Sequence, residues 1–226
     1  MADAQAWNSI VKELETKNVT LVAVSKTKPV SDIQALYDLG QRDFGENYVQ
    51  ELVDKQPQLP PDVRWHYIGH LQSNKVKYIA PFVHLIHAVD SFKLLLEINK
   101  QARKNNRTID VLLQMHVATE ESKFGMNERD IVEFMDYCEA QQEQLQNIRI
   151  RGLMGMASFS DDEQLVRSEF KRLHAMFLNL KKSSFIMQPH FDTCSMGMSG
   201  DYKLAIEEGS TMVRIGSLLF GFRQYN

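Results

Sequence analysis

The sequence has few cysteines, no long apolar run and no strong excess of charge of either sign, and each absence excludes a class of protein. Its two cysteines, Cys138 and Cys194, lie far apart, which favours reduced thiols over a disulfide framework or a cysteine metal site. No apolar stretch approaches the ~20 residues that a membrane-spanning helix needs. The N-terminal residues 1–7 lack the basic and apolar regions of a signal peptide. We therefore expect a cytoplasmic protein that does not enter a membrane.

Two further absences concern partners and domain organisation. The formal net charge is −3 and no long basic block occurs, so the sequence does not predict a nucleic acid as a partner. No spacing of His, Cys, Asp or Glu predicts a metal site. No linker rich in proline, glycine or serine divides the chain, which predicts a single domain over residues 1–226.

What the sequence does have is a regular alternation of strand-like and helix-like segments. We expect strands at residues 20–26, 43–47, 64–69, 83–89, 109–117, 148–156, 190–195 and 211–215. An additional helix over residues 3–17 precedes the first strand. Eight strand-then-helix units predict an α/β fold, a single-domain (β/α)8 TIM barrel. A doubly wound open sheet is the alternative, which the absence of a Gly-x-Gly-x-x-Gly turn disfavours.

The first predicted strand ends on a lysine, Lys26. In a barrel, functional residues lie at the C-terminal ends of the strands. Burying an unpaired cation is costly unless the amine is held neutral or consumed in a covalent bond, as in a Schiff base with a carbonyl compound. The alternative is that Lys26 extends into solvent from the strand end.

A second cluster, rich in serine and glycine, follows the last two predicted strands. It comprises Ser195–Gly200 and Arg214–Ser217. In barrels these loops often bind a phosphate through backbone N–H groups. Arg214 would face the barrel mouth as a donor-only group, or would pair with a carboxylate. A lysine for an aldehyde and a cradle for a phosphate together predict pyridoxal 5'-phosphate (PLP) as the cofactor.

Five ordered segments of the chain resemble the YggS/PROSC family, the pyridoxal phosphate homeostasis proteins. These segments are Ala23–Pro29, Phe44–Glu51, Trp65–Lys75, Ser195–Ser199 and Arg214–Gly216. The resemblance implies a barrel of the alanine racemase N-terminal type. It also implies that Lys26 forms the Schiff base and that Arg214 faces the pyridine nitrogen. Ser195, Gly216 and Ser217 would hold the phosphate, Asn47 would lie near the ring, and His66 and Met198 would lie close to the cofactor.

The resemblance implies a function in PLP (vitamin B6) homeostasis without robust catalysis. PLP-dependent apoenzymes would be the recipients, and we expect a monomer. An amino-acid racemase is one alternative. Racemases of this barrel type take a second base, a tyrosine, from an additional C-terminal domain of the partner subunit. Here the sequence ends about ten residues after the eighth strand, with Tyr225 as a conceivable substitute. A cofactor-free Schiff-base aldolase is the other alternative.

Overall fold

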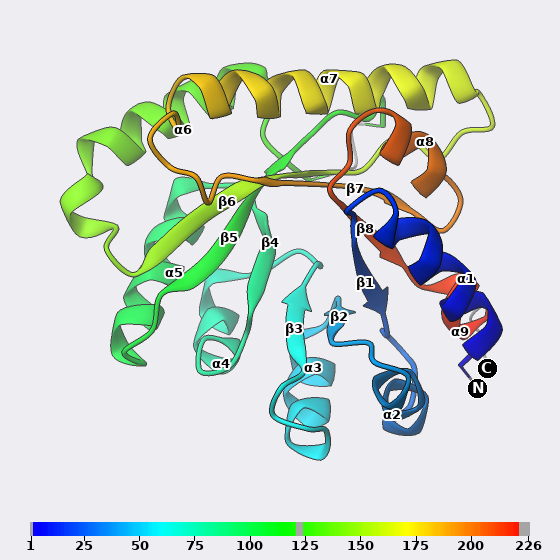
Figure 1. The fold of residues 1–226 in the computed structure, drawn as a ribbon. Coiled ribbons are helices and arrows are strands. Elements are labelled where there is room, and N and C mark those ends of the chain that lie inside the picture. Colours follow the sequence, from blue (N-terminus) through cyan, green and yellow to red (C-terminus); the bar gives the residue numbers. More distant parts are fainter. Residues whose placement is uncertain (1, 121–123, 222–226) are drawn as a thin grey trace.

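Eight parallel strands close into a barrel in chain order in the computed structural model, which describes residues 2–120 and 124–221 (Figure 1). The strands are β1 Thr20–Val24, β2 Asp43–Glu46, β3 Arg64–Tyr67, β4 Leu85–Val89, β5 Ile109–Met115, β6 Ile148–Gly155, β7 Thr193–Met198 and β8 Met212–Ile215. Because β1 also pairs with β8, the sheet has no open edge. The predicted barrel is therefore confirmed and the open-sheet alternative is wrong.

Helices cover the outside of this barrel. They are α1 Ala4–Glu15, α2 Val30–Asp38, α3 Val49–Lys55, α4 Val76–Ile79, α5 Phe92–Lys104, α6 Glu128–Ala140, α7 Glu163–Lys182, α8 Tyr202–Glu207 and α9 Ser217–Phe220. Short 3-10 turns occupy Gln56–Gln58, Ser73–Lys75 and Gln142–Gln144. The main hydrophobic core lies between the helices and the strands. A smaller apolar cluster fills the barrel interior, formed by Val22, Leu85, Leu112, Met154 and Met212.

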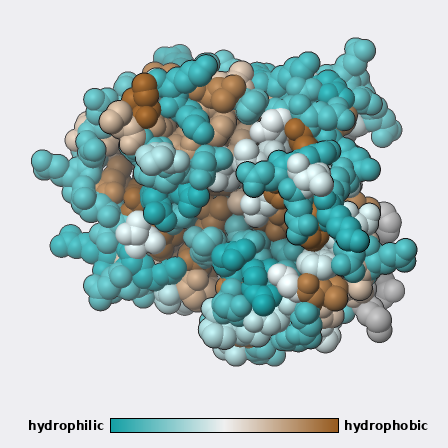
Figure 2. Space-filling model, viewed as in Figure 1, coloured by the Kyte–Doolittle hydropathy of each residue, from teal (hydrophilic) through white to brown (hydrophobic). Residues whose placement is uncertain are grey.

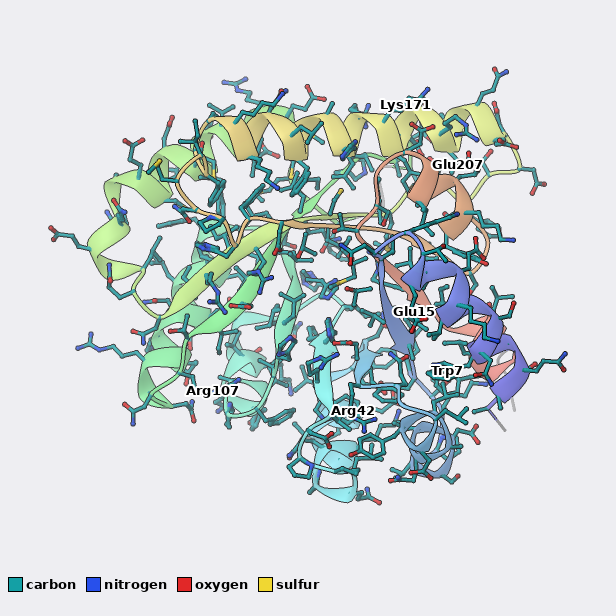
Figure 3. All side chains as sticks on the ribbon, viewed as in Figure 1. Trp7, Glu15, Arg42, Arg107, Lys171 and Glu207 are labelled. Atoms are coloured by element: carbon teal, nitrogen blue, oxygen red, sulfur yellow. The ribbon has the colours of Figure 1, made fainter. Side chains whose placement is uncertain are left out.

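The predicted additional helix is α1, which lies beside β8 and α9 in Figure 1. Asp3 caps it by accepting a hydrogen bond from the Ala6 N–H. Trp7, labelled in Figure 3, is buried and donates its indole N–H to Gln41 across 3.0 Å. The backbone N–H of Asp3 bonds to the Leu219 carbonyl at 2.8 Å. The helix therefore ties the segment before the first strand to the segment that follows the last one.

The seventh strand differs from its prediction, with consequences for the site. We expected residues 190–195, but β7 spans Thr193–Met198 because Phe191 packs against Phe177 of α7 and against Phe185 in the turn that follows α7. Gly197 has φ +97°, and a Cβ there would lie 2.6 Å from the Ala205 Cβ. The strand is irregular at this point, where its register with β8 shifts. Ser195 consequently lies inside the barrel wall, and Met198 is the residue at the strand end.

The molecular surface is mostly hydrophilic on the face drawn in Figure 2, with apolar side chains scattered over it. Within residues 2–120 and 124–221, no helix combines the length and the apolar character that crossing a membrane requires.

Candidate functional site

A cavity of about 420 Å³ opens at the C-terminal end of the barrel strands. Six of the eight predicted site residues line it: Lys26, Asn47, Met198, Arg214, Gly216 and Ser217. Val24, Ile68 and Met156 supply an apolar part of the wall, and Lys28 and Ser199 also line the cavity. The chain segments named by the sequence pattern thus meet at one place, although they span nearly two hundred residues.

Lys26 lies in the turn after β1 rather than in the strand, because β1 ends at Val24. Its two neighbours are held by the residues of β2 and α3. The Ser25 hydroxyl donates to Glu46 at 2.6 Å, and the Thr27 N–H donates to Glu51. Thr27 has φ +63°, a left-handed conformation that a β-branched residue rarely adopts. The contacts on both sides therefore fix the backbone that presents the Lys26 amine.

Lys55 is the centre of this support. Its ammonium is buried and donates to Glu46 at 2.7 Å, to Glu51 at 2.6 Å and to the Ser25 carbonyl at 2.8 Å. Glu46 is fully buried, and burial raises the pKa of its carboxyl against the opposing charge of Lys55. The ion pair thus compensates a buried carboxylate directly beneath the Lys26 turn.

We expect Lys55→Met to destabilise the protein by about 3–5 kcal/mol, because it leaves the Glu46 carboxylate buried without its cation. Urea unfolding at neutral pH measures the free-energy change. The double variant Glu46→Gln/Lys55→Met should recover most of the loss, since the amide oxygen still accepts the Ser25 hydrogen bond. A loss below about 1 kcal/mol in the single variant would contradict this account.

Arg214 is buried, and within residues 2–120 and 124–221 its acceptors are all neutral. Its guanidinium donates to the carbonyl of Gly155 at 3.0 Å, and to the carbonyl and hydroxyl of Ser195 at 2.9 and 2.7 Å. Burial lowers the pKa of Arg214 to about 10, which still leaves it protonated at neutral pH. Among the described residues it forms no ion pair, so the carboxylate-pairing alternative does not apply there. Three of its five donors are engaged, and Arg214 also lines the cavity.

The serine- and glycine-rich loops form the cavity wall near α9. The Gly216 N–H donates to the Ser199 hydroxyl at 3.2 Å, and Ser217 begins α9. A Cβ at Gly216 would press on the Val24 carbonyl oxygen at 3.2 Å, so a larger residue would displace the loop from β1. Ser199 was not among the predicted site residues. Its place in the Ser195–Gly200 cluster pointed to it, but the family resemblance assigned the phosphate to Ser195.

Asn47 presents a buried side-chain oxygen to this region. Its Oδ1 has no hydrogen-bond partner within the described part of the chain. The backbone of Asn47 is fixed from two sides: a Cβ at Gly69 would lie 2.2 Å from its carbonyl oxygen, and the Tyr67 hydroxyl bonds to that oxygen at 3.0 Å. A buried acceptor without a partner, on a rigid backbone, is what a bound ligand would satisfy.

The other two predicted residues, Ser195 and His66, do not line this cavity. Ser195 is fully buried within β7, one layer beneath, and contacts Arg214. His66 faces a second cavity of about 390 Å³ at the opposite end of the barrel. The sequence did not show either position. The position of Ser195 depends on where β7 ends, and that of His66 depends on which end of the barrel a side chain in the middle of a strand faces.

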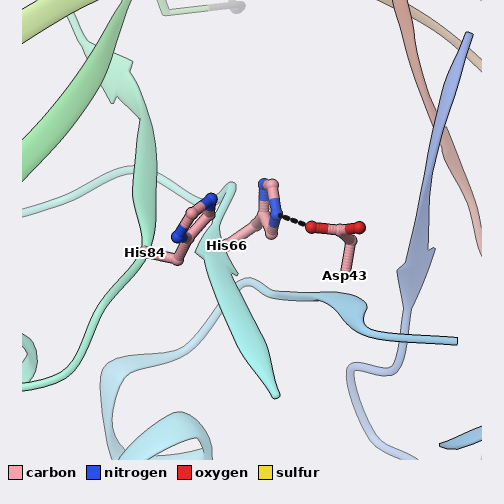
Figure 4. A group of neighbouring side chains, drawn as sticks. All are labelled: Asp43, His66 and His84. Atoms are coloured by element: carbon pink, nitrogen blue, oxygen red, sulfur yellow. Dashed lines mark hydrogen bonds and ion pairs between the residues drawn. The ribbon is translucent and has the colours of Figure 1, made fainter. Parts of the chain in front are cut away.

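Around His66 the fold assembles a polar cluster with Asp43 and His84 (Figure 4). His66 Nε2 lies 2.9 Å from Asp43 Oδ1, and Arg64 makes a two-point contact with the same carboxylate. Burial alone raises the pKa of Asp43, but the bonds from Arg64 and His66 outweigh it and hold the pKa well below its usual range. Three ligand-type atoms lie within 4.8 Å of one another here, which no spacing in the sequence indicated.

His87 gives the fold a dependence on pH. It is fully buried, and burial together with the neighbouring His66, Arg214 and His84 lowers the pKa of His87 well below the ordinary value. The unfolded chain takes up this proton near the ordinary histidine pKa of about 6.5 and the folded chain does not, so stability falls as pH decreases below about 6.5. We expect a slope of up to about 1.4 kcal/mol per pH unit from this residue. Between pH 7 and 5, the free energy of unfolding measured in urea should depend less steeply on pH in His87→Gln than in the wild type. An equal dependence on pH in the two proteins would contradict this role of His87.

Three features define the class of this protein: the barrel, the lysine after its first strand, and the serine- and glycine-rich wall after its last two strands. The family model "Alanine racemase, N-terminal domain" matches residues 3–224. The pyridoxal phosphate homeostasis protein of Aquifex aeolicus is 41% identical over 206 residues, covering 91% of this chain and 87% of that protein. The protein of that name from Escherichia coli K12 is 39% identical over 214 residues, covering 93% and 88%. The chain therefore belongs to the family of pyridoxal phosphate homeostasis proteins, within the alanine racemase N-terminal class.

Solved structures agree with this assignment. PipY of Synechococcus elongatus PCC7942, with PLP bound, is 34% identical with a TM-score of 0.85, covering 96% of this chain and 99% of that chain. Alanine racemase from Streptomyces lavendulae, 16% identical, has a TM-score of 0.75 and covers 99% of this chain but 59% of that enzyme. The second comparison shows a shared barrel fold only.

Proposed function

We propose that this protein binds PLP in the cavity at the C-terminal end of the barrel, as a Schiff base on Lys26, and that it holds and releases the cofactor in PLP homeostasis. The observation that carries the proposal is the meeting of Lys26, Asn47, Arg214, Gly216 and Ser217 around one cavity. PipY, whose barrel superposes over nearly the whole chain, has been solved with PLP bound.

The residues present fit this cofactor. PLP has three groups that a protein can bind: an aldehyde, a ring nitrogen and a phosphate dianion. The aldehyde condenses with an amine. Lys26 is the amine, held by its fixed neighbours. The Ser199 and Ser217 hydroxyls and the N–H groups near Gly216 are suited to the phosphate. Ser195 does not line the cavity, so it would act on the cofactor only indirectly, through Arg214 and on the side of the ring nitrogen. Arg214 would donate to the ring nitrogen and thereby keep it unprotonated, because a guanidinium cannot accept a hydrogen bond.

The test is titration of the purified protein with PLP, followed by borohydride reduction and peptide mapping. We expect an absorbance band of a protein-bound Schiff base and a reduced adduct on Lys26. A protein that gains no such band, yet is trapped by borohydride with a sugar phosphate, would support the cofactor-free aldolase instead. Adduct formation only on other lysines would overturn the assignment of Lys26.

We further propose that the protein is not a robust racemase. Racemisation removes a proton from one face of the substrate and returns it on the other, which calls for two acid/base groups on opposite faces. Among the described residues lining the cavity, the titratable side chains are Lys26, Lys28 and Arg214. Tyr225, the conceivable second base, lies outside the described residues. Incubation of the PLP-loaded protein with L-alanine in deuterated water decides: rapid Lys26-dependent α-deuteration with inversion would establish a racemase.

The remaining parts of the proposal concern partners. We propose PLP-dependent apoenzymes as recipients of the cofactor and a monomer as the acting form. Loaded protein mixed with an apoenzyme, with free PLP held below the level that reactivates the apoenzyme alone, should restore its activity. Light scattering at micromolar concentration tests the monomer.

A further inference from the structure

Five polar side chains form one continuous hydrogen-bonded line across the barrel interior. Asp43 Oδ1 lies 2.9 Å from His66 Nε2, and His66 Nδ1 lies 2.9 Å from His87 Nε2. His87 Nδ1 lies 3.2 Å from the Ser195 hydroxyl, which lies 2.7 Å from the Arg214 guanidinium. The five residues come from β2, β3, β4, β7 and β8, and all are buried. The line begins at the cavity that Asp43 and His66 share and ends at the cavity that Arg214 lines.

The chemistry of the two ends fixes the direction of every bond in this line. Arginine can only donate, and an ionised carboxylate can only accept. Asp43 stays ionised because Arg64 and His66 bond to it. His66 must then carry its proton on Nε2.

The directions of the bonds from His66 to His87 and from His87 to Ser195 follow from the position of the proton on His66. A neutral His66 with its proton on Nε2 accepts at Nδ1, so His87 must donate from its own Nε2. His87 Nδ1 then accepts from the Ser195 hydroxyl, whose oxygen accepts from Arg214. His66, His87 and Ser195 each donate one of these bonds and accept another, while Asp43 only accepts and Arg214 only donates.

A line running the other way conflicts with the neighbours. It would turn His66 Nε2 into an acceptor facing the Asp43 carboxylate, unless His66 carried both protons. A doubly protonated His66 would be a cation buried beside His87 and Asp43, and Arg64 already neutralises that carboxylate. His84, whose ring contacts the ring of His66, carries no negative charge that would stabilise such a cation.

We infer that Asp43, His66, His87 and Ser195 form a one-way hydrogen-bond chain that orients the Arg214 guanidinium toward the cofactor cavity from the opposite end of the barrel. The four are positioning residues, since Arg214 is the one member of these five described residues that lines that cavity. The effect on the cofactor rests on the proposed PLP function, whereas the chain itself does not. The Ser195 carbonyl and hydroxyl both accept from the guanidinium, and donation of the hydroxyl proton to His87 leaves an oxygen lone pair for Arg214.

The first measurement needs no cofactor. Nitrogen-15 NMR of histidine side chains at pH 7.5 should find His66 and His87 both neutral, protonated on Nε2 and bare on Nδ1. Asp43→Asn removes the acceptor-only end, because an amide can accept or donate. It should therefore produce mixed tautomers at His66 and also at His87, which is the second residue from Asp43 in the hydrogen-bond chain. His84→Gln is the matched control, since His84 lies in the same cavity but forms no side-chain hydrogen bond to these five described residues.

The second measurement uses the PLP-loaded protein. Ser195→Ala should shift upward the pH at which the bound ring nitrogen takes up a proton, because Arg214 loses its hydroxyl acceptor and its fixed direction. Ser195→Thr keeps a hydroxyl and should restore the wild-type midpoint, while His84→Gln should leave it unchanged. These variants also serve if Asp43→Asn does not fold.

Three outcomes would overturn the inference. They are a wild-type His66 protonated on both nitrogens, an Asp43→Asn variant whose His87 tautomer stays unchanged, or a midpoint that Ser195→Ala does not move. If the protein has the expected tautomers but does not bind PLP, the hydrogen-bond chain stands and the proposed function is refuted. Failure of the hydrogen-bond chain can thus be told apart from failure of the proposed function.

Discussion

Lys26→Ala is expected to abolish the covalent attachment of PLP and to leave the barrel folded. The side chain lies in the turn after β1 and is partly exposed, so its removal should change the free energy of unfolding by no more than about 0.5 kcal/mol. The bonds from Ser25 to Glu46 and from Thr27 to Glu51 hold the turn, and they persist in the variant. PLP can then bind only through its phosphate and ring, at lower affinity. Absorbance and borohydride trapping with peptide mapping measure the loss.

Lys28→Ala is the matched control for this experiment. Lys28 lines the same cavity two residues away, but its ammonium donates to the Phe220 carbonyl at 2.7 Å. We expect this variant to keep the Schiff base and to lose some stability where α9 ends. A borohydride-reducible adduct that survives Lys26→Ala and disappears in Lys28→Ala would transfer the role to Lys28.

The sequence predicted the barrel well because its signals are local. Apolar, β-branched runs predict buried parallel strands, and their alternation with amphipathic segments predicts the helical layer. The order of the strands follows from the alternation, since short connections keep consecutive parallel strands adjacent. Residues at or just after strand ends, such as Asn47 and Arg214, line the cavity for the same reason.

The errors arose where the outcome depends on tertiary contacts. Phe191 reads as a strand residue, yet it stacks on Phe185 outside the barrel, and β7 runs three residues past the predicted end. That shift moved Ser195 from the predicted phosphate loop into the wall, and brought Ser199 to the cavity instead. His66 lies in the middle of a short strand, and no sequence pattern states which end of a barrel such a side chain faces.

Arg214→Glu is expected to have the second large effect. In the unloaded protein the new carboxylate would face the carbonyl oxygens of Gly155 and Ser195, and it would be buried without a cation. We expect a destabilisation of about 3–5 kcal/mol. PLP should stabilise this variant more than the wild type, because a protonated ring nitrogen would pair with the carboxylate. Thermal melts with and without PLP measure the difference, and Arg214→Gln is the uncharged control.

The bound cofactor should also titrate differently. A carboxylate beside the ring nitrogen favours its protonated form, so the midpoint of the pH-dependent absorbance change should rise in Arg214→Glu and move less in Arg214→Gln. An unchanged midpoint, with PLP still bound, would place Arg214 away from the ring. A protonated ring withdraws electrons more strongly than the neutral ring that an arginine beside the nitrogen would favour. If α-proton exchange can be induced in this barrel, we expect Arg214→Glu to show more of it than the wild type.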